Sequence, residues 1–356
     1  MADLTDAPAL APLLARGALL SPFKRPRPDA GFPRHPLVLP GVRIDLARLA
    51  AYERVCGFAT GEDALPVTYP HVLGFPLAMR LMSGWGFPLP LLGLVHTSIE
   101  ITQRRSLAAT GEYEVTVQIE GLAPHRRGTE AAVVTGVRAA GDVVWESRST
   151  YLARHRTDGR TGQARQADGH TAKTPQADGH TAQAPQADGH TTQTPQADDR
   201  TTQTPQADGH TTQTPQADDR TTQTPQADGH TTQTPQADDR TTRTPQEEAG
   251  PLPVVAEWRL AGDIGRRYAA ASGDRNPIHL YPLTARPFGF RRAVAHGMWT
   301  LARCLAAHGV PERALVRAQF RAPVQLPGTV TYAAQGERFE LRGGDRTQVS
   351  GAVYPA

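Results

Sequence analysis

The stretch from Ala270 to Met298 begins A-A-S-G-D-R-N-P-I-H and ends A-H-G-M. It places a carboxylate, Asp274, and an imidazole, His279, five residues apart on an irregular Asn-Pro turn. A second turn, H-G-M, then leads into a stretch with helical periodicity. An acid, a base and a glycine backbone N–H at a helix start are three parts that proton chemistry beside a carbonyl requires. This stretch therefore predicts an enzyme.

The composition sets the broad class. A length of 356 residues is enough for two ordinary domains. The chain has no apolar run of about eighteen residues, so we expect no transmembrane helix. It begins M-A-D-L-T-D-A-P, which does not resemble a signal peptide. The two cysteines, Cys56 and Cys304, lie in apolar helix-like stretches, which predicts buried core residues and no disulfide framework. A cytoplasmic location fits this pattern.

The middle of the chain is repetitive. Residues 166–245 are tandem copies of a ten-residue unit, Q-A-D-[GD]-[HR]-T-[AT]-[QKR]-[TA]-P, and residues 156–165 resemble a degenerate copy. The unit has no large apolar residue and carries a proline in every copy, so it can neither bury a core nor continue a helix. It predicts a disordered linker over 156–250. Five copies carry histidine, but their ten-residue spacing is only a weak signal for metal binding.

Charge is distributed unevenly along the chain. The formal net charge is +3, and the repeats alone contain eleven aspartates against five basic residues, so the remainder is clearly basic. A basic surface suits an acidic partner or a phosphate-bearing substrate. Arg286, Arg291 and Arg292 lie inside the stretch quoted above and are candidates for such contacts, although solvated surface arginines are an equally good interpretation. No zinc-finger spacing or aromatic-basic pattern indicates nucleic acid.

The segments on either side of the repeats resemble distant copies of one unit. Each has a first helix with an acidic start, over Asp45–Phe58 and Asp263–Asp274, and then a second helical pattern, over Phe75–Met82 and Met298–Leu305. Strand-like runs close both segments. We expect these strands over Leu94–Thr102, Tyr113–Glu120, Thr129–Arg138, Val143–Ala153, Leu315–Arg321, Thr329–Gln335, Arg338–Arg342 and Thr347–Val353. The order predicts a duplicated α+β domain in which a curled antiparallel sheet wraps a central helix.

The acid/base pair belongs to the second copy alone. When the two first helices are aligned, Gly57 falls opposite Gly273 and Phe58 falls opposite Asp274. No histidine follows Phe58 at the spacing of His279. The first copy instead offers an apolar, aromatic-rich stretch over 73–94, which would suit an enlarged acyl pocket.

The motifs S-G-D-R-N-P-I-H and G-F-R-R-A-V-A-H-G-M resemble the signature of the MaoC-like, or (R)-specific enoyl-CoA hydratase, family, which has the hot-dog fold. In the first copy, L-P-V-T-Y-P-H-V-L-G-F-P-L-A-M and G-L-V-H-T-S-I-E-I resemble actinobacterial double-hot-dog 3-hydroxyacyl-thioester dehydratases. The resemblance implies a non-catalytic hot-dog domain over 1–155 and a catalytic one over 251–356. It implies a (3R)-3-hydroxyacyl-thioester dehydratase or trans-2-enoyl-CoA hydratase of fatty-acid or related acyl metabolism.

The resemblance also implies roles for single residues. Asp274 and His279 would hold one water and move protons between it and C2 of the substrate, and which group moves which proton is left open. The N–H of Gly297 would bind the thioester oxygen. Asn276 would orient the turn or the acyl carbonyl, and His296 would hold the turn or line the pocket. A local hydrogen bond is the simplest role for Ser272.

This chemistry needs no metal and no redox cofactor. The partner would be an acyl-CoA or acyl carrier protein thioester, with no nucleic acid and no membrane, and the protein would be a monomeric pseudo-dimer or a homodimer. Two alternatives stay open: a branched or dicarboxylic acyl-CoA as substrate, or a non-catalytic acyl-binding or scaffold protein.

Overall fold

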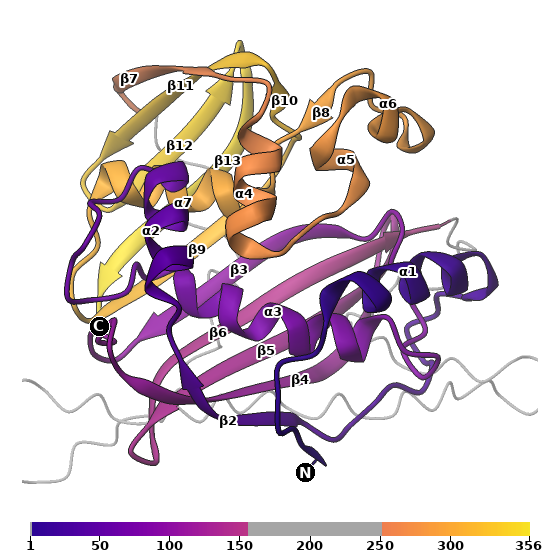
Figure 1. Cartoon of the computed structure of the whole chain (residues 1–356). Helices are drawn as coiled ribbons and strands as arrows, with labels where there is room; N and C mark the ends of the chain where they lie inside the picture. The colour runs from indigo at the N-terminus through magenta and orange to yellow at the C-terminus, as the bar shows by residue number, and fades with distance from the viewer. Residues whose placement is uncertain (1, 156–250) are drawn as a thin grey trace, which may run out of the picture. The chain divides into compact units, whose positions relative to one another are not determined.

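One antiparallel sheet of eleven strands runs through both copies, in the order β1-β2-β4-β5-β6-β3-β9-β13-β12-β11-β7, with only β1 parallel to its neighbour (Figure 1). The computed structural model describes residues 2–155, here the N-terminal half, and 251–356, the C-terminal half. Both halves belong to one compact unit. The predicted disordered linker lies outside the described residues.

The N-terminal half contributes six strands of the sheet and the C-terminal half five. The first six are β1 (Ala2–Asp3), β2 (Leu37–Arg43), β4 (Glu112–His125), β5 (Gly128–Ala139), β6 (Asp142–Arg154) and β3 (Val95–Gln103). The other five are β9 (Ala314–Phe320), β13 (Arg346–Pro355), β12 (Arg338–Gly343), β11 (Gly328–Gln335) and β7 (Val254–Leu260). β3 pairs with β9, and the Arg317 Nε atom donates to the Glu100 carboxylate across this junction at 2.6 Å. The two sheets expected from the sequence are thus one continuous sheet.

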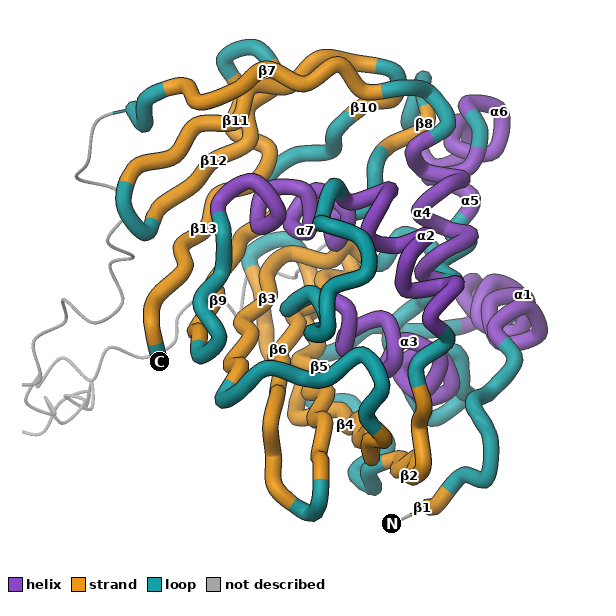
Figure 2. Tube along the Cα trace, turned by 60° about the vertical axis from the view of Figure 1, so that its left-hand side comes forward, coloured by secondary structure: helices purple, strands orange, loops and turns teal. Residues whose placement is uncertain are grey.

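Each half curls its strands around one helix, as in a double hot-dog fold. In the N-terminal half, α3 (Tyr69–Met82) packs on β4 and β5. In the C-terminal half, α7 (Gly297–His308) contacts β12 and lies inside the curl formed by β7, β11, β12 and β13 (Figure 2). Both helices are buried on most faces because the sheet covers one side and other helices cover the rest. None of the described helices has the length and apolar character needed to cross a bilayer.

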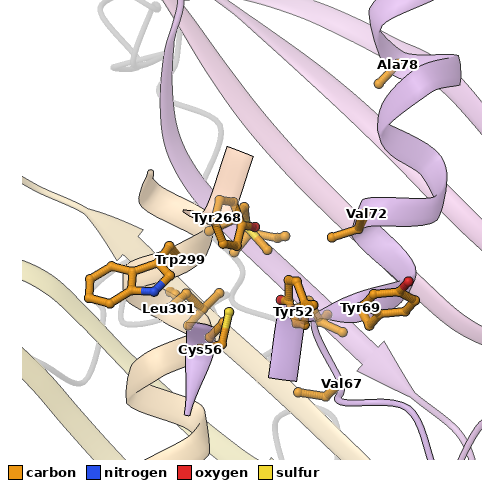
Figure 3. Close-up of a cluster of buried hydrophobic side chains, with 14 of the residues drawn as sticks. Tyr52, Cys56, Val67, Tyr69, Val72, Ala78, Tyr268, Trp299 and Leu301 are labelled. Atoms are coloured by element: carbon orange, nitrogen blue, oxygen red, sulfur yellow. The ribbon is translucent and has the colours of Figure 1, made fainter. Parts of the chain in front are cut away.

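The two helices that the sequence alignment matches, α2 (Leu46–Cys56) and α4 (Ile264–Ser272), pack against each other. Tyr52 and Tyr268 meet at the centre of this contact, with ring centroids 5.8 Å apart (Figure 3). The indole N–H of Trp299 donates to the Val55 carbonyl at 2.8 Å, which ties α7 to α2. Burial of these aromatic side chains, each worth about 2–3 kcal/mol, fixes the C-terminal end of α4 where the Asp274 turn begins. Cys56 and Cys304 are buried and unbridged, as predicted.

The predicted elements are confirmed, and most of the predicted strands end within one or two residues of the observed ones. The sequence patterns missed α1 (Leu10–Leu20), β2 and β7. The smaller elements are η1 (Ser21–Phe23), α5 (Pro277–Leu280), α6 (Pro282–Ala285), η3 (Arg286–Phe288), β8 (Ala293–Val294) and β10 (Gln325–Leu326). α4 through β8 build the candidate site.

Candidate active site

The site begins where α4 ends. Gly273 adopts the left-handed conformation, with φ 85°, and its N–H donates to the Ala269 carbonyl at 2.9 Å, so the helix stops there. The next residue, Asp274, is held by two local hydrogen bonds. Its N–H donates to Ser272 Oγ at 3.2 Å, and its Oδ1 accepts from the N–H of Asn276 at 3.1 Å. The carboxylate is therefore oriented by its own turn.

The short helix α5 carries His279 into the core. Asn276 caps it, since its Oδ1 accepts from the Ile278 N–H at 3.4 Å, and Pro277 occupies the first helical position, where no N–H is needed. The Nδ1 atom of His279 lies 2.7 Å from the Val294 carbonyl oxygen in β8. A carbonyl oxygen can only accept, so Nδ1 carries the proton and Nε2 of the neutral ring keeps its lone pair. His279 is thereby set up as a base.

His296 holds the two groups together. Its ring stacks on that of His279, with centroids 3.7 Å apart, and its centroid lies 4.7 Å from that of the tilted Tyr268 ring. Its Nε2–H donates to the main-chain carbonyl of Asp274 at 2.9 Å, and the same atom lies 3.9 Å from the Asp274 carboxylate. Its Nδ1 atom is buried and has no hydrogen-bond partner among the described residues.

Asp274, His279 and His296 converge on one point. One ligand atom from each lies within 4.8 Å of the others, a spacing at which they could share a water, a substrate oxygen or a metal ion. The Asp274 side chain is 28% exposed, whereas the His296 side chain is 2% exposed. The carboxylate is therefore the group that reaches the solvent-accessible side.

Burial shifts the pKa of all three groups toward their neutral forms. It raises the pKa of Asp274 above its ordinary value, although the neighbouring His279 and the Asn276 N–H oppose the shift. It lowers the pKa of His279 below its ordinary value, against the pull of the Asp274 carboxylate. It lowers the pKa of His296 still further, and the nearby His279 adds to that effect. Both imidazoles are consequently neutral near pH 7.

Gly297 opens α7 directly after His296. The first N–H groups of a helix have no acceptor within the helix, and the positive end of the helix dipole lies there. A Cβ at position 297 would lie 3.2 Å from the Phe320 ring, a tight contact that would require this ring in β9 to shift by a few tenths of an ångström. Gly297 thus offers donors to a developing negative charge.

The structure brings together Asp274, His279, His296 and the start of α7. The oxygens of Asn276 and Ser272 bond backbone N–H groups of the turn and are not among the converging atoms. Arg286, Arg291 and Arg292 are exposed, and Arg292 donates to the Pro327 carbonyl at 3.3 Å. The same turn in the N-terminal half has Gly57 at φ 84°, as the alignment predicts, and Phe58 where the carboxylate would be.

Two residues of the N-terminal half approach this site and were not foreseen. Tyr151 in β6 lies close enough to Asp274 for the carboxylate charge to raise its pKa, although burial is the larger cause. His96 in β3 packs on Phe320, with ring centroids 4.7 Å apart. Both belong to a half without the acid/base pair, and only the three-dimensional pairing of β3 with β9 brings them near.

Comparisons with known proteins find a matching family model and similar chains and structures. Residues 251–353 match the family model described as MaoC like domain. The chain is 29% identical over 315 residues to 3-hydroxyacyl-thioester dehydratase X of Mycobacterium tuberculosis, covering 88% of this chain and 84% of that protein. A crystal structure of that protein, HtdX, superposes with a TM-score of 0.60 at 26% identity, covering 90% of this chain and 100% of the other. A MaoC-like dehydratase from Phytophthora capsici shares the fold at 15% identity, with a TM-score of 0.52, covering 91% of this chain and 96% of that one.

Proposed function

Because residues 251–353 of this chain form a MaoC-like domain, we propose that the protein is a hydro-lyase that interconverts trans-2-enoyl and (3R)-3-hydroxyacyl thioesters. The relative named 3-hydroxyacyl-thioester dehydratase X supports this activity. The observation that carries the proposal is the convergence of an ionisable carboxylate and a neutral imidazole beside the start of α7. The substrate would be an acyl thioester of coenzyme A or of an acyl carrier protein.

The proposed reaction uses one water held between Asp274 and His279. In hydration, the water oxygen attacks C3 of the enoyl thioester while one of its protons passes to the pair, and a proton from the pair is delivered to C2. The C2–C3 double bond becomes single, and the proton count of the enzyme is restored. Dehydration runs the same steps in reverse. The lone pair on His279 Nε2 and the two oxygens of Asp274 are the atoms available for these transfers.

The start of α7 would stabilise the intermediate charge. As the water adds at C3, negative charge develops on the thioester oxygen. The Gly297 N–H and the helix dipole would bind that oxygen, and the absence of a side chain at 297 would let it approach. We assign His296, Ser272 and Asn276 to positioning, because their hydrogen bonds fix the main chain of the Asp274 turn and the first turn of α5.

A direct assay separates this proposal from a non-catalytic acyl-binding protein. Purified protein is incubated with crotonyl-CoA, and loss of absorbance by the conjugated thioester is followed. The proposal expects steady consumption and a 3-hydroxybutyryl-CoA product of R configuration. Binding without turnover, for this substrate and for longer enoyl thioesters, would favour the acyl-binding alternative instead.

The pH profile follows from the two shifted groups. The reaction requires an ionised Asp274 and a neutral His279, and both requirements fail as pH falls because both groups gain protons. The Asp274 pKa is raised from 3.8 and the His279 pKa is lowered from 6.5. We expect kcat/KM to decline as pH falls, with apparent pKa values that belong to the pair as a whole. A kcat/KM that rises as pH is lowered from 7 would contradict this assignment.

We also propose that the catalytic domain spans 251–356, that 1–155 is its non-catalytic companion, and that 156–250 is a linker. Deleting 166–245 should leave kcat/KM for an enoyl-CoA within about twofold, since the described contacts that build the site come from outside that segment. Activity and the thermal midpoint of both proteins would be compared. Loss of folding on deletion would overturn the linker assignment.

The unbridged cysteines fit our placement of the protein in the cytoplasm.

A further inference from the structure

A row of polar side chains lies on the N-terminal half of the sheet beneath α3. Ser147, Ser149 and Tyr151 alternate along β6 and therefore share one face. That face is the one turned toward α3, because Thr135 pairs with Ser147 and lies against Gly74 of α3. Ser147 is 1% and Ser149 is 2% exposed. The Ser147 Oγ atom has no hydrogen-bond partner among the described residues, and the Ser149 hydroxyl lies beside that of Tyr151 and interacts with it.

Two histidines complete the row at its end near the catalytic residues. His71 from the first turn of α3 stacks on His96, with ring centroids 6.0 Å apart, and His96 stacks on Tyr151 at 4.5 Å. A β-bulge at Thr97 interrupts β3 directly after His96, a device that often re-aims a side chain beside a site. His71 Nδ1 and His96 Nε2 are buried and lack partners among the described residues. We call His71, His96, Ser147, Ser149 and Tyr151 the polar row.

The polar row begins at the candidate active site. His96 packs on Phe320, which lies against Gly297, the proposed donor to the thioester oxygen. Tyr151 is close enough to Asp274 to feel its charge. An acyl chain with its thioester oxygen at Gly297 and its C3 at Asp274 would therefore run past Phe320 and Tyr151 when it extends into the N-terminal half.

The chemistry of the row identifies the kind of group that it fits. Folded proteins leave few buried polar atoms without hydrogen-bond partners, so the three at His71, His96 and Ser147 indicate a polar ligand. Burial lowers the pKa of His71 to about 4 and that of His96 to about 3, so both rings are neutral. Neutral imidazoles and hydroxyls offer both donors and acceptors, so they can pair with a hydroxyl or a carbonyl oxygen. They carry no positive charge, so a buried carboxylate would lack a countercharge there.

We infer that the polar row binds a hydroxyl or carbonyl oxygen carried on the acyl chain beyond C3, so that the enzyme selects oxygenated acyl thioesters over plain ones. This inference rests on the proposed function. It makes the half without the acid/base pair the part of the protein that determines specificity. The selection operates through buried hydrogen bonds, which discriminate against a substrate lacking its polar partner far better than apolar contacts do.

The test compares trans-2-decenoyl-CoA with its 6-hydroxy, 8-hydroxy and 8-keto derivatives and with the matching ω-carboxylate. The wild-type protein should favour at least one hydroxy or keto substrate by about tenfold or more in kcat/KM. Ser149→Ala removes a hydroxyl and keeps a small side chain. His96→Phe removes the ring nitrogens and keeps an aromatic ring that can stack. Each should lower kcat/KM for the favoured substrate about tenfold, mainly through KM, and leave the plain substrate within about twofold. Ser350→Ala, a buried serine of β13 away from the row, is the control.

Each outcome has one meaning. Equal kcat/KM for plain and oxygenated substrates, preference for the ω-carboxylate, or variants that slow both substrates alike would overturn the inference and leave the proposed function standing. Absence of turnover with every thioester would overturn the proposed function and this inference with it. Thermal midpoints of all variants are measured in parallel, and Ser149→Ala, the smaller change, decides the question where His96→Phe does not fold.

Discussion

Replacing Asp274 with Asn is expected to lower kcat/KM for an enoyl-CoA by about 10²–10⁴-fold, the usual contribution of a positioned acid or base. Asn cannot take or give a proton, but it can accept the same hydrogen bond from the Asn276 N–H, so the turn should persist. His279→Ala should have an effect of the same size, because the Nε2 lone pair disappears with the ring. The double variant should lose little more than either single one, since the two groups act as a unit.

Asp263→Asn is the matched control for this experiment. Asp263 lies at the opposite end of α4 and its side chain makes no capping hydrogen bond, so the same chemical change should leave kcat/KM within about twofold. Far-ultraviolet circular dichroism and thermal midpoints would establish that all variants are folded. Turnover near the wild-type rate in folded Asp274→Asn would remove Asp274 from the reaction.

Replacing Gly265 with Ala is expected to damage both activity and stability. A Cβ at position 265 would lie 1.9 Å from the carbonyl oxygen of His279 and 3.0 Å from its carbonyl carbon. These are backbone atoms of α5, so the helix that carries His279 must move. Displacing a catalytic group by about 1 Å can cost about 10²-fold in rate, and overpacking of this kind costs about 1–3 kcal/mol in the free energy of unfolding. Measured kcat/KM and urea unfolding curves would report the two effects.

Intrinsic helix propensity makes the opposite prediction for Gly265, because Ala in a helix interior is about 1 kcal/mol better than Gly. The sign of the change in unfolding free energy therefore decides between local propensity and the contact between α4 and α5. Gly262→Ala serves as the control, since a Cβ there would meet nothing closer than Pro327 Cδ at an ordinary 3.5 Å. An unchanged or increased stability of Gly265→Ala would show that the two helices are less closely packed than described.

Features of the site that depend on neighbouring residues could be predicted from the sequence. The Asp274 turn, the Asn276 cap and the glycine that ends α4 are all set within a few residues, and the aligned pair Gly57 and Gly273 share one conformation. Repeating patterns of apolar residues likewise placed the long strands of both halves. The strand β2 was missed because Pro40-Gly41 interrupts it, and the structure places a register shift there between Leu39 and Val42.

Contacts between residues far apart in the chain could not be predicted from these patterns. The stacking of His296 between His279 and Tyr268 depends on how α7, α5 and α4 pack together. The approach of Tyr151 to Asp274 depends on the junction of β3 with β9. Comparison of the two copies by sequence indicated that the first lacks the acid/base pair and offers an apolar stretch over 73–94. It did not show that the first copy faces the second copy's site with polar side chains.

The junction of β3 with β9 has a further consequence for the behaviour of each half. Because β3 and β9 pair, each strand covers the N–H and C=O groups that the other would otherwise leave on an open sheet edge. Ile99 and Ile101 on β3 and Val316 on β9 are buried there. A half expressed by itself would present this apolar edge to solvent and could add a strand from any other copy, so the fusion of two copies in one chain also protects the protein against aggregation.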